Sequence, residues 1–407
     1  MKPTVKTIEG GVLAAKGFRA AGVPAAIKYE GRNDVALLVA DAPCAAAAVF
    51  TTNKVAAAPV LYDREVVKGG RIQAILANSG CANACTGEAG YKDAELSALA
   101  TAGELGLKAK HVLVASTGVI GRRLPMERLL GGLKAAVAAL GRTDAHARDA
   151  AKAIMTTDTK SKQAAARTTV GGKTVTVGGM AKGSGMIEPN MATMLAFVTT
   201  DAAISPAMLR RAIRLAVARS FNRIVVDGDE STNDSLFLLA SGAAGNETIT
   251  RAGEDFSAFL VALEAVCVSL ARQMAADGEG ATKFVTVRVK GARSERDAER
   301  AARAVAKSPL AKTSWFGKDP NWGRVLAAVG YSGADVSDRT AEVFYGKEWA
   351  YRRGEVADAK QLKRLEKVMQ EKELDITVDL HLGKGEAVIY TCDFSLDYVH
   401  INADYTT

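Results

Sequence analysis

Short apolar runs, separated by glycine-containing turns, fill most of the chain. Three of these runs predict strands, and the last two are apolar enough to be mostly buried: Asp34–Ala40, Arg71–Asn78 and His111–Thr117. Apolar residues recur with a helical period between such runs. This alternation predicts an α/β or α+β protein with mixed sheets.

Helices are predicted where the helical period meets a start or stop signal. Gly106 ends one of them, and Ser205 with Pro206 forms a typical N-cap and first turn for another. The predicted helices are Lys92–Leu105, Asp144–Ala153, the segment from Pro206 and Phe256–Ala276.

The last part of the chain predicts a smaller α/β domain that begins near Lys283. Ser294–Ala306 has a helical period. The segment ELDITVDLHLGKGEAVIYTCDF alternates apolar and polar residues, turns at Gly-Lys-Gly and returns as a second apolar run. This pattern predicts a β-hairpin.

Composition places the chain among folded proteins with a large core. Of its 407 residues 48% are apolar, which excludes disorder and allows two or three domains. No run approaches the ~18 consecutive apolar residues of a membrane span, and the first residues lack the apolar core of a signal peptide. Five cysteines, an odd number, argue against a disulfide framework. We therefore expect a cytoplasmic protein without membrane association.

The net charge of +8 changes this picture little. Lysine and arginine are spread along the chain, without the basic stripe and interleaved aromatic residues of a nucleic-acid binder. The excess is interpreted as a solvated surface, although a positive potential that attracts an acidic substrate is an alternative.

Motifs for phosphates and metals are incomplete. GGMAKGSG lacks the Lys-Ser/Thr of a P-loop, and VASTGVIG lacks the spacing of a dinucleotide-binding turn. Cys81 and Cys85 have no second pair to complete a zinc site. The acids of VDGDEST (Val226–Thr232) can hold a metal but occur more often at caps and turns. We predict no metal and no cofactor.

The most informative segment is Met180–Ala202, where small residues and Pro189 lead into an apolar run. At the boundary Thr193 follows Ala192, an arrangement in which the hydroxyl can attack the preceding carbonyl. Cleavage there would free an α-amine, whose pKa of ~7.7–8.0 suits a base at neutral pH better than that of a lysine at ~10.4. The residues alone leave open that Thr193 is an ordinary strand residue.

A second segment, HVLVASTGVIGRR, ends a buried strand in Ser-Thr-Gly. Backbone N–H groups of Thr117 and Gly118 can form an oxyanion hole there. A plain turn from strand to helix is the alternative.

The segment KGSGMIEPNMATMLAF closely resembles the self-cleavage segment of the ornithine acetyltransferase family, whose members make arginine precursors. The resemblance covers essentially the whole chain. Further segments match in order: NACTG, STGVIG, MTTDT (Met155–Thr159), VDGDESTND, KTSWFGKDPNWGR and DYVHINADYTT. Several ordered matches are far more specific than any one of them.

The resemblance implies a ping-pong reaction in which Thr193 takes acetyl from N-acetylornithine and passes it to glutamate. Some family members also use acetyl-CoA as donor. Thr117 and Gly118 are similar to the family's oxyanion-hole pair. The positions that resemble its substrate contacts are Thr156, Lys182, Thr193, Glu279, Asn402 and Thr407.

The chemistry of these residues fits such substrates. Lys182 can bind an α-carboxylate, and Glu279 can bind the ornithine ammonium. Asn402 and Thr407 can add hydrogen bonds, and Thr407 also brings the terminal carboxylate. Thr157 competes with Thr156 as the contact residue. Cys81 departs from the family segment, which more usually has asparagine there.

The resemblance also implies a fold and an assembly. The fold is an αββα-like layered core with an N-terminal nucleophile, formed by residues 1–192 and 193–283, with a smaller domain at 284–407. Two copies of each cleavage product would form an α₂β₂ heterotetramer. The nearest rival is an N-terminal-nucleophile aminopeptidase or amidase; a nucleotide-binding or non-enzymatic protein is a more distant one.

Overall fold

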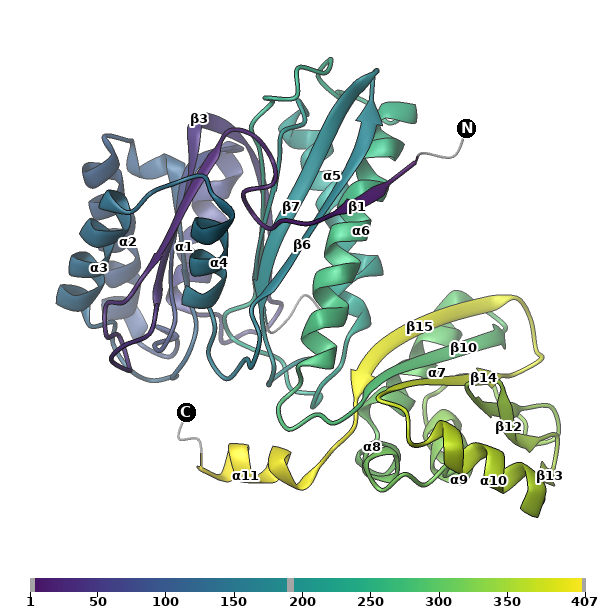
Figure 1. The fold of residues 1–407 in the computed structure, drawn as a ribbon. Coiled ribbons are helices and arrows are strands. Elements are labelled where there is room, and N and C mark those ends of the chain that lie inside the picture. Colours follow the sequence, from purple (N-terminus) through teal and green to yellow (C-terminus); the bar gives the residue numbers. More distant parts are fainter. Residues whose placement is uncertain (1–3, 189–193, 405–407) are drawn as a thin grey trace.

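The computed structural model describes residues 4–188 and 194–404, which form two sheets covered by helices (Figure 1). The larger sheet and its helices comprise β1 (Lys6–Ile8), β2 (Phe18–Val23), β3 (Val35–Phe50), α1 (Ala58–Val66), β4 (Arg71–Asn78), α2 (Gly87–Leu105), β5 (Val112–Ser116), α3 (Met126–Ala138), α4 (Asp144–Ala153), β6 (Lys162–Val170), β7 (Lys173–Lys182), β8 (Leu195–Thr200), α5 (Pro206–Arg219), β9 (Ser235–Ala240) and α6 (Glu254–Ala276). The rest comprises β10 (Phe284–Ala292), α7 (Glu295–Lys307), α8 (Pro309–Phe316), α9 (Trp322–Gly330), β11 (Glu342–Tyr345), β12 (Glu348–Arg352), β13 (Glu355–Val356), α10 (Ala359–Val368), β14 (Glu373–Asp379), β15 (Gly385–Cys392) and α11 (Leu396–Asp404).

The long strand β3 joins the two halves of the large sheet. The strand order is β1-β6-β7-β8-β9-β3-β4-β5, and β2 also pairs with β3. The first half of β3 pairs with β2 and β4, and its second half pairs with β9. A register shift between Val39 and Cys44 separates the two halves. Such an irregularity bends a strand, and the two halves of the sheet face each other across a shared core.

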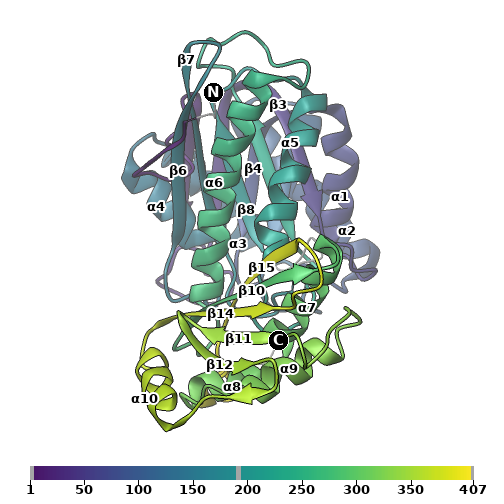
Figure 2. The same cartoon turned by 90° about the vertical axis from the view of Figure 1, so that its right-hand side faces the viewer.

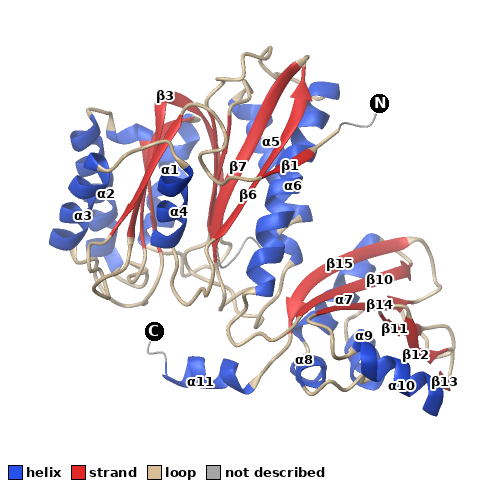
Figure 3. Cartoon of the chain, in the orientation of Figure 1, coloured by secondary structure: helices blue, strands red, loops and turns tan. Residues whose placement is uncertain are grey.

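Side-chain alternation along the strands builds four layers. Leu38 and Phe197 point into the core between the two halves of the sheet. Leu37 points the other way, toward α1–α3, whereas Val198 points toward α5 and α6. Figures 1 and 3 show these strands between the two groups of helices. The structure confirms the layered α/β prediction with mixed sheets, since both parallel and antiparallel pairs occur.

Most predicted helices form near the expected bounds. α4 occupies the expected range, and the Ser205 hydroxyl caps α5 by accepting the Met208 N–H at 3.4 Å. α2 begins at Gly87, one turn and more before the expected Lys92. α6 is long and apolar enough to pass for a membrane span, but it packs along the large sheet as a core helix (Figure 2).

The smaller sheet corrects the hairpin prediction. Its order is β13-β12-β11-β14-β10-β15, so β14 and β15 do not pair with each other. β10 lies between them, parallel to β14 and antiparallel to β15. The alternation and the Gly-Lys-Gly turn identified two strands of opposite direction. They could not reveal that a strand from ninety residues earlier occupies the gap.

The chain returns to the large sheet at its end. The Asp393 carboxylate accepts the N–H groups of Thr282 and Lys283 at 2.8 and 2.9 Å, which ties the entrance of the smaller sheet to its exit. Helix α11 then runs beneath the layered core (Figure 1). This return brings residues near the end of the chain to the candidate site.

Candidate active site

A cavity of about 100 Å³, here called the site cavity, lies beside the ends of β5 and β7 and the beginning of β9. The structure brings together on its wall the predicted residues Thr117, Gly118, Thr156, Lys182, Glu279 and Asn402. Ala192, Thr193 and Thr407 lie outside the described residues.

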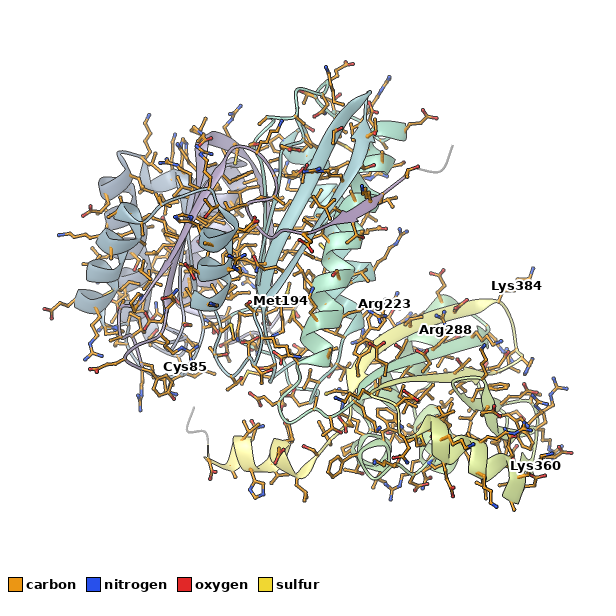
Figure 4. The ribbon with its side chains drawn as sticks, viewed as in Figure 1. Cys85, Met194, Arg223, Arg288, Lys360 and Lys384 are labelled. Atoms are coloured by element: carbon orange, nitrogen blue, oxygen red, sulfur yellow. The ribbon has the colours of Figure 1, made fainter. Side chains whose placement is uncertain are left out.

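Both flanks of the predicted cleavage segment are held beside this cavity. The Asp227 carboxylate accepts the N–H groups of Met186 and Ile187 at 2.6 and 2.7 Å. On the other flank, the Met194 carbonyl accepts the Ser235 N–H at 2.9 Å, and the next residue pairs with Lys182. Met194 lies toward the lower end of the core strands (Figure 4). The backbone on each side of residues 189–193 is therefore anchored.

Thr117 departs from the expectation that its backbone N–H is free for an oxyanion. That N–H donates to the Asn78 carbonyl at 3.0 Å, as strand pairing continues one residue past β5. The Thr117 hydroxyl instead accepts from Lys182 Nζ at 3.4 Å, so its own hydrogen is available to another acceptor. Thr117 can thus serve through Oγ1 and not through its backbone.

Gly118 lines the site cavity and keeps a backbone donor. Within residues 4–188 and 194–404, no acceptor is found for its N–H. Its φ is +131°, and a Cβ there would lie 2.4 Å from the carbonyl carbon of Gly80. Only glycine fits both constraints. The Thr117 hydroxyl and the Gly118 N–H together form a possible pair of oxyanion donors.

Lys182 belongs to a buried charge network that the sequence did not reveal. Asp158 accepts Lys162 Nζ at 2.6 Å and the Gly183 N–H at 2.7 Å, and Lys162 also contacts Asp277 at 2.6 Å. Burial alone would raise the pKa of Asp158, but the ammonium groups of Lys182 and Lys162 lower it to about 2. Burial lowers the pKa of Lys182, which Asp158 opposes. Asp158 is therefore the carboxylate that faces two buried lysine side chains.

We expect Asp158→Asn to lower the free energy of unfolding by about 3 kcal/mol, because it leaves buried ammonium groups without their carboxylate. The native pKa of Asp158 lies below its usual 3.8. Asp158 therefore contributes fully to the free energy of unfolding above about pH 4. This contribution, about 2 kcal/mol, is lost as the pH falls through about 2. Urea unfolding between pH 2 and 7 measures both effects. A variant with wild-type stability at pH 7 would contradict this role.

Glu279 and Asn402 form the outer side of the site cavity. Asn402 Nδ2 donates to Glu279 Oε2 at 2.9 Å, although 123 residues separate them in the chain. The Glu279 N–H donates to the Ser184 carbonyl at 2.8 Å. A Cβ on Gly185 would lie 2.4 Å from the Glu279 carboxylate carbon, so glycine is required for this close approach. An acidic group thus lines the same cavity as the buried Lys182.

Thr156 and Thr157 both line the site cavity, so either threonine is placed to contact a substrate. The Thr156 N–H donates to Asp158 Oδ2 at 3.0 Å. The Thr157 hydroxyl shares a hydrogen bond of 2.7 Å with the Ser184 hydroxyl.

Sequence reasoning missed Asn233 and Thr232, which also line the cavity. Asn233 Nδ2 donates to the carbonyls of Ala82 and Ser116 at 2.6 and 2.8 Å, and its Oδ1 accepts from Thr232. Both residues lie in the VDGDESTND segment, in which the sequence pointed to no role for the neutral side chains. Its neutral polar residues were the unused signal.

The acids and cysteines that were candidates for a metal site have other surroundings in the structure. Among the described residues, no group of three histidine, cysteine or acidic side chains is arranged to hold a metal ion. Asp227 instead anchors the flank of the cleavage segment. Cys81 is buried, with its thiol pKa raised by burial, and Cys85 is exposed; both are free thiols.

Comparisons with known proteins place the chain in a family. The model of the ArgJ family matches residues 19–407. The arginine biosynthesis bifunctional protein ArgJ of Geobacter sulfurreducens is 54% identical over 97% of this chain and its own whole length. That of Symbiobacterium thermophilum is 54% identical over 98% of this chain and 99% of its own.

A solved structure is also similar in sequence. Ornithine acetyltransferase from Mycobacterium tuberculosis, complexed with ornithine, is 45% identical; the match covers 46% of this chain and 99% of that one, with a TM-score of 0.43. The matched family model spans nearly all of this chain, and the two curated relatives match along almost their whole length. The chain is therefore a member of the ArgJ family.

Proposed function

We propose that this chain cleaves itself between Ala192 and Thr193 and then transfers acetyl from N-acetylornithine to glutamate. Acetyl-CoA serves as a second donor. The observation that carries the proposal is the meeting of Thr117, Gly118, Lys182 and Glu279 in one cavity, beside the anchored flanks of the cleavage segment. The names of the relatives support it: they are bifunctional proteins of arginine biosynthesis, and a solved relative binds ornithine.

Self-cleavage begins with attack of the Thr193 hydroxyl oxygen on the Ala192 carbonyl carbon. The peptide C–N bond breaks, the amine takes the proton, and an ester links Ala192 to Thr193. Water hydrolyses this ester and frees the α-amine and hydroxyl of Thr193. The anchored flanks support this step because they hold the two reacting residues within a short segment.

Acetyl transfer uses the same hydroxyl twice. The α-amine of Thr193 takes the hydroxyl proton as the oxygen attacks the acetyl carbonyl of N-acetylornithine. Ornithine leaves with that proton, and acetyl-Thr193 remains. The α-amine of glutamate then attacks the ester, which releases N-acetylglutamate and restores the hydroxyl. The Thr117 hydroxyl and Gly118 N–H stabilise the oxyanion in both halves.

Substrate recognition rests on two charges of opposite sign in the wall of the site cavity. Lys182 binds the α-carboxylate common to ornithine and glutamate derivatives, and Glu279 binds the ornithine ammonium. Thr156, Asn402 and Thr407 add hydrogen bonds.

The decisive experiment incubates the purified protein with glutamate and each donor separately and measures N-acetylglutamate. We expect formation from both donors. Release of acetate or ornithine without N-acetylglutamate would identify water as the acceptor and favour the amidase alternative.

We expect Glu279→Gln to reduce kcat/KM for N-acetylornithine roughly ten- to hundred-fold, since a charge-assisted hydrogen bond is lost. Glutamate has no side-chain ammonium and should be affected much less. Lys182→Met, in contrast, should weaken both substrates because both carry the α-carboxylate. Steady-state kinetics with each substrate varied in turn provides the measurement. Equal losses for both substrates in Glu279→Gln would exclude it as the ammonium partner.

We also propose that the cleavage products, Met1–Ala192 and Thr193–Thr407, assemble as α₂β₂ in the cytoplasm. Residues 1–192 and 193–283 form the catalytic core, and 284–407 the smaller domain. Native mass spectrometry of the purified protein tests the assembly, and fractionation of cells tests the compartment.

A further inference from the structure

A second cavity, of about 290 Å³, lies next to the site cavity. Lys28, Tyr29 and Arg32 line it from the loop between β2 and β3, together with Gly80 just after β4. Thr156 and Thr157 line both cavities. The two cavities are therefore neighbours with a common wall.

Two glycines also lie side by side between the cavities. Gly80 lines the second cavity and Gly118 lines the site cavity, and the two glycines are in contact. A Cβ on Gly118 would lie 2.4 Å from Gly80 C and 2.6 Å from Cys81 N, so a side chain at Gly118 cannot be accommodated between them. A ligand in the second cavity thus ends close to the proposed oxyanion donors.

Two cations give the second cavity a positive side. Arg32 Nη2 donates to the Met155 carbonyl at 2.6 Å and so ties the guanidinium to the common wall. An arginine has five N–H donors, so further donors remain for a ligand. Lys28 Nζ lies 4.9 Å from the centre of the Tyr29 ring. These groups favour an anionic ligand, with phosphate as a well-suited partner.

The remaining lining does not oppose an anion. Asp34 also lines the cavity, but its carboxylate is directed to the backbone, where it accepts the N–H groups of Ala25 and Ile27 at 2.6 Å each. Tyr29 is 50% exposed, so its aromatic ring is accessible to a ligand. N-acetylornithine ends in an ammonium, which Lys28 and Arg32 would repel. The second cavity therefore suits a different donor.

We propose that the second cavity binds the phosphate-bearing part of an acyl-thioester donor such as acetyl-CoA, whose acetyl end reaches Thr193 from the side on which Gly80 lies. This inference rests on the proposed function. The Thr193 oxygen bonds to the acetyl carbon, the thioester C–S bond breaks, and the hydroxyl proton goes to the leaving thiolate. The result is acetyl-Thr193 and free CoA thiol. The two donors enter from different sides and meet at one nucleophile.

The test uses Lys28→Glu in the full protein. We expect kcat/KM for acetyl-CoA to fall roughly ten- to hundred-fold, as a charge-assisted contact becomes a repulsion. Transfer from N-acetylornithine should stay within about two-fold. Acetyl-pantetheine, which lacks the nucleotide and its phosphates, should be used equally by wild type and variant. Lys360→Glu makes the same charge change on α10, in the smaller sheet's part of the chain (Figure 4), where Lys360 lines neither cavity, and should alter the use of neither donor.

Binding without turnover gives an independent readout. CoA should bind the wild-type protein in calorimetry, and Lys28→Glu should weaken it by the same factor as the kinetic loss. Tyr29→Ala should weaken CoA roughly five-fold or more if the adenine stacks on this ring. Unchanged CoA binding in both variants, or equal kinetic losses for both donors in Lys28→Glu, would overturn the proposal.

Failure of the proposed function has a different signature. In that case the wild-type protein makes no N-acetylglutamate from N-acetylornithine, whatever CoA binding shows. A wild-type protein that transfers acetyl from N-acetylornithine but neither binds CoA nor uses acetyl-CoA would overturn only the second-cavity assignment.

Discussion

Thr193→Ala will accumulate as one full-length chain of 407 residues and will have no measurable acetyl transfer. Alanine lacks the hydroxyl that attacks the Ala192 carbonyl, so neither the cleavage ester nor acetyl-Thr193 can form. Loss of a nucleophile lowers kcat by about 10⁴-fold or more. A denaturing gel and the N-acetylglutamate assay measure the two effects.

Thr193→Ser is the matched control for that experiment. It keeps a hydroxyl at the same position and should be cleaved and active at a reduced rate. Wild-type protein incubated with N-acetylornithine alone should carry one acetyl group on the first residue of the Thr193–Thr407 fragment. Efficient cleavage of Thr193→Ala, or acetyl found on Lys182, would reject the assignment.

Thr117→Val will lower kcat for both donors by about 10²–10³-fold, the usual effect of losing one oxyanion donor. The substitution removes the hydroxyl and keeps the branched shape, and the backbone N–H remains bonded to Asn78. Self-cleavage should slow as well, because it passes through the same kind of oxyanion. Pre-steady-state acetylation and the rate of chain cleavage are the measurements.

Thr117→Ser retains the hydroxyl and should recover most of the activity. The variants need comparable melting temperatures, since Lys182 Nζ loses an acceptor in Thr117→Val. If Thr117→Val acetylates Thr193 at the wild-type rate, the oxyanion is stabilised by other groups.

Local sequence signals were sufficient for several elements. Ser205 with Pro206 specified the start of α5, because an N-cap hydroxyl and a proline at the first helical position act within one turn. The residues around Ala192 and Thr193 suggested a nucleophile but left an ordinary strand residue open, and the ordered family segments favoured the nucleophile.

The hairpin formed by β6 and β7 also carries a local signal in the sequence. Gly171 and Gly172, with φ of +53° and +73°, form the two-residue turn between β6 and β7. Two glycines between apolar alternating segments are a hairpin signal. This hairpin ends at Lys182, so its strand placement was predictable from sequence.

Tertiary structure alone decided which distant groups meet. Thr117 was expected to use its backbone, but pairing with Asn78 consumes that N–H and leaves the hydroxyl. The pairing partner of a strand end depends on the whole sheet, as does the insertion of β10 between β14 and β15.

The charged groups around the site also separate what the sequence specifies from what only the folded chain decides. The sequence by itself determined the residue types and several of the helices, because a helix start or stop depends on neighbours within a few positions, and it supplied Thr193 as a hypothesis. Only the folded chain places Asp158 between two buried lysines and brings Asn402 to Glu279. Coulomb interactions and desolvation depend on distance through space and on burial, and the order of residues specifies neither until the layers have packed.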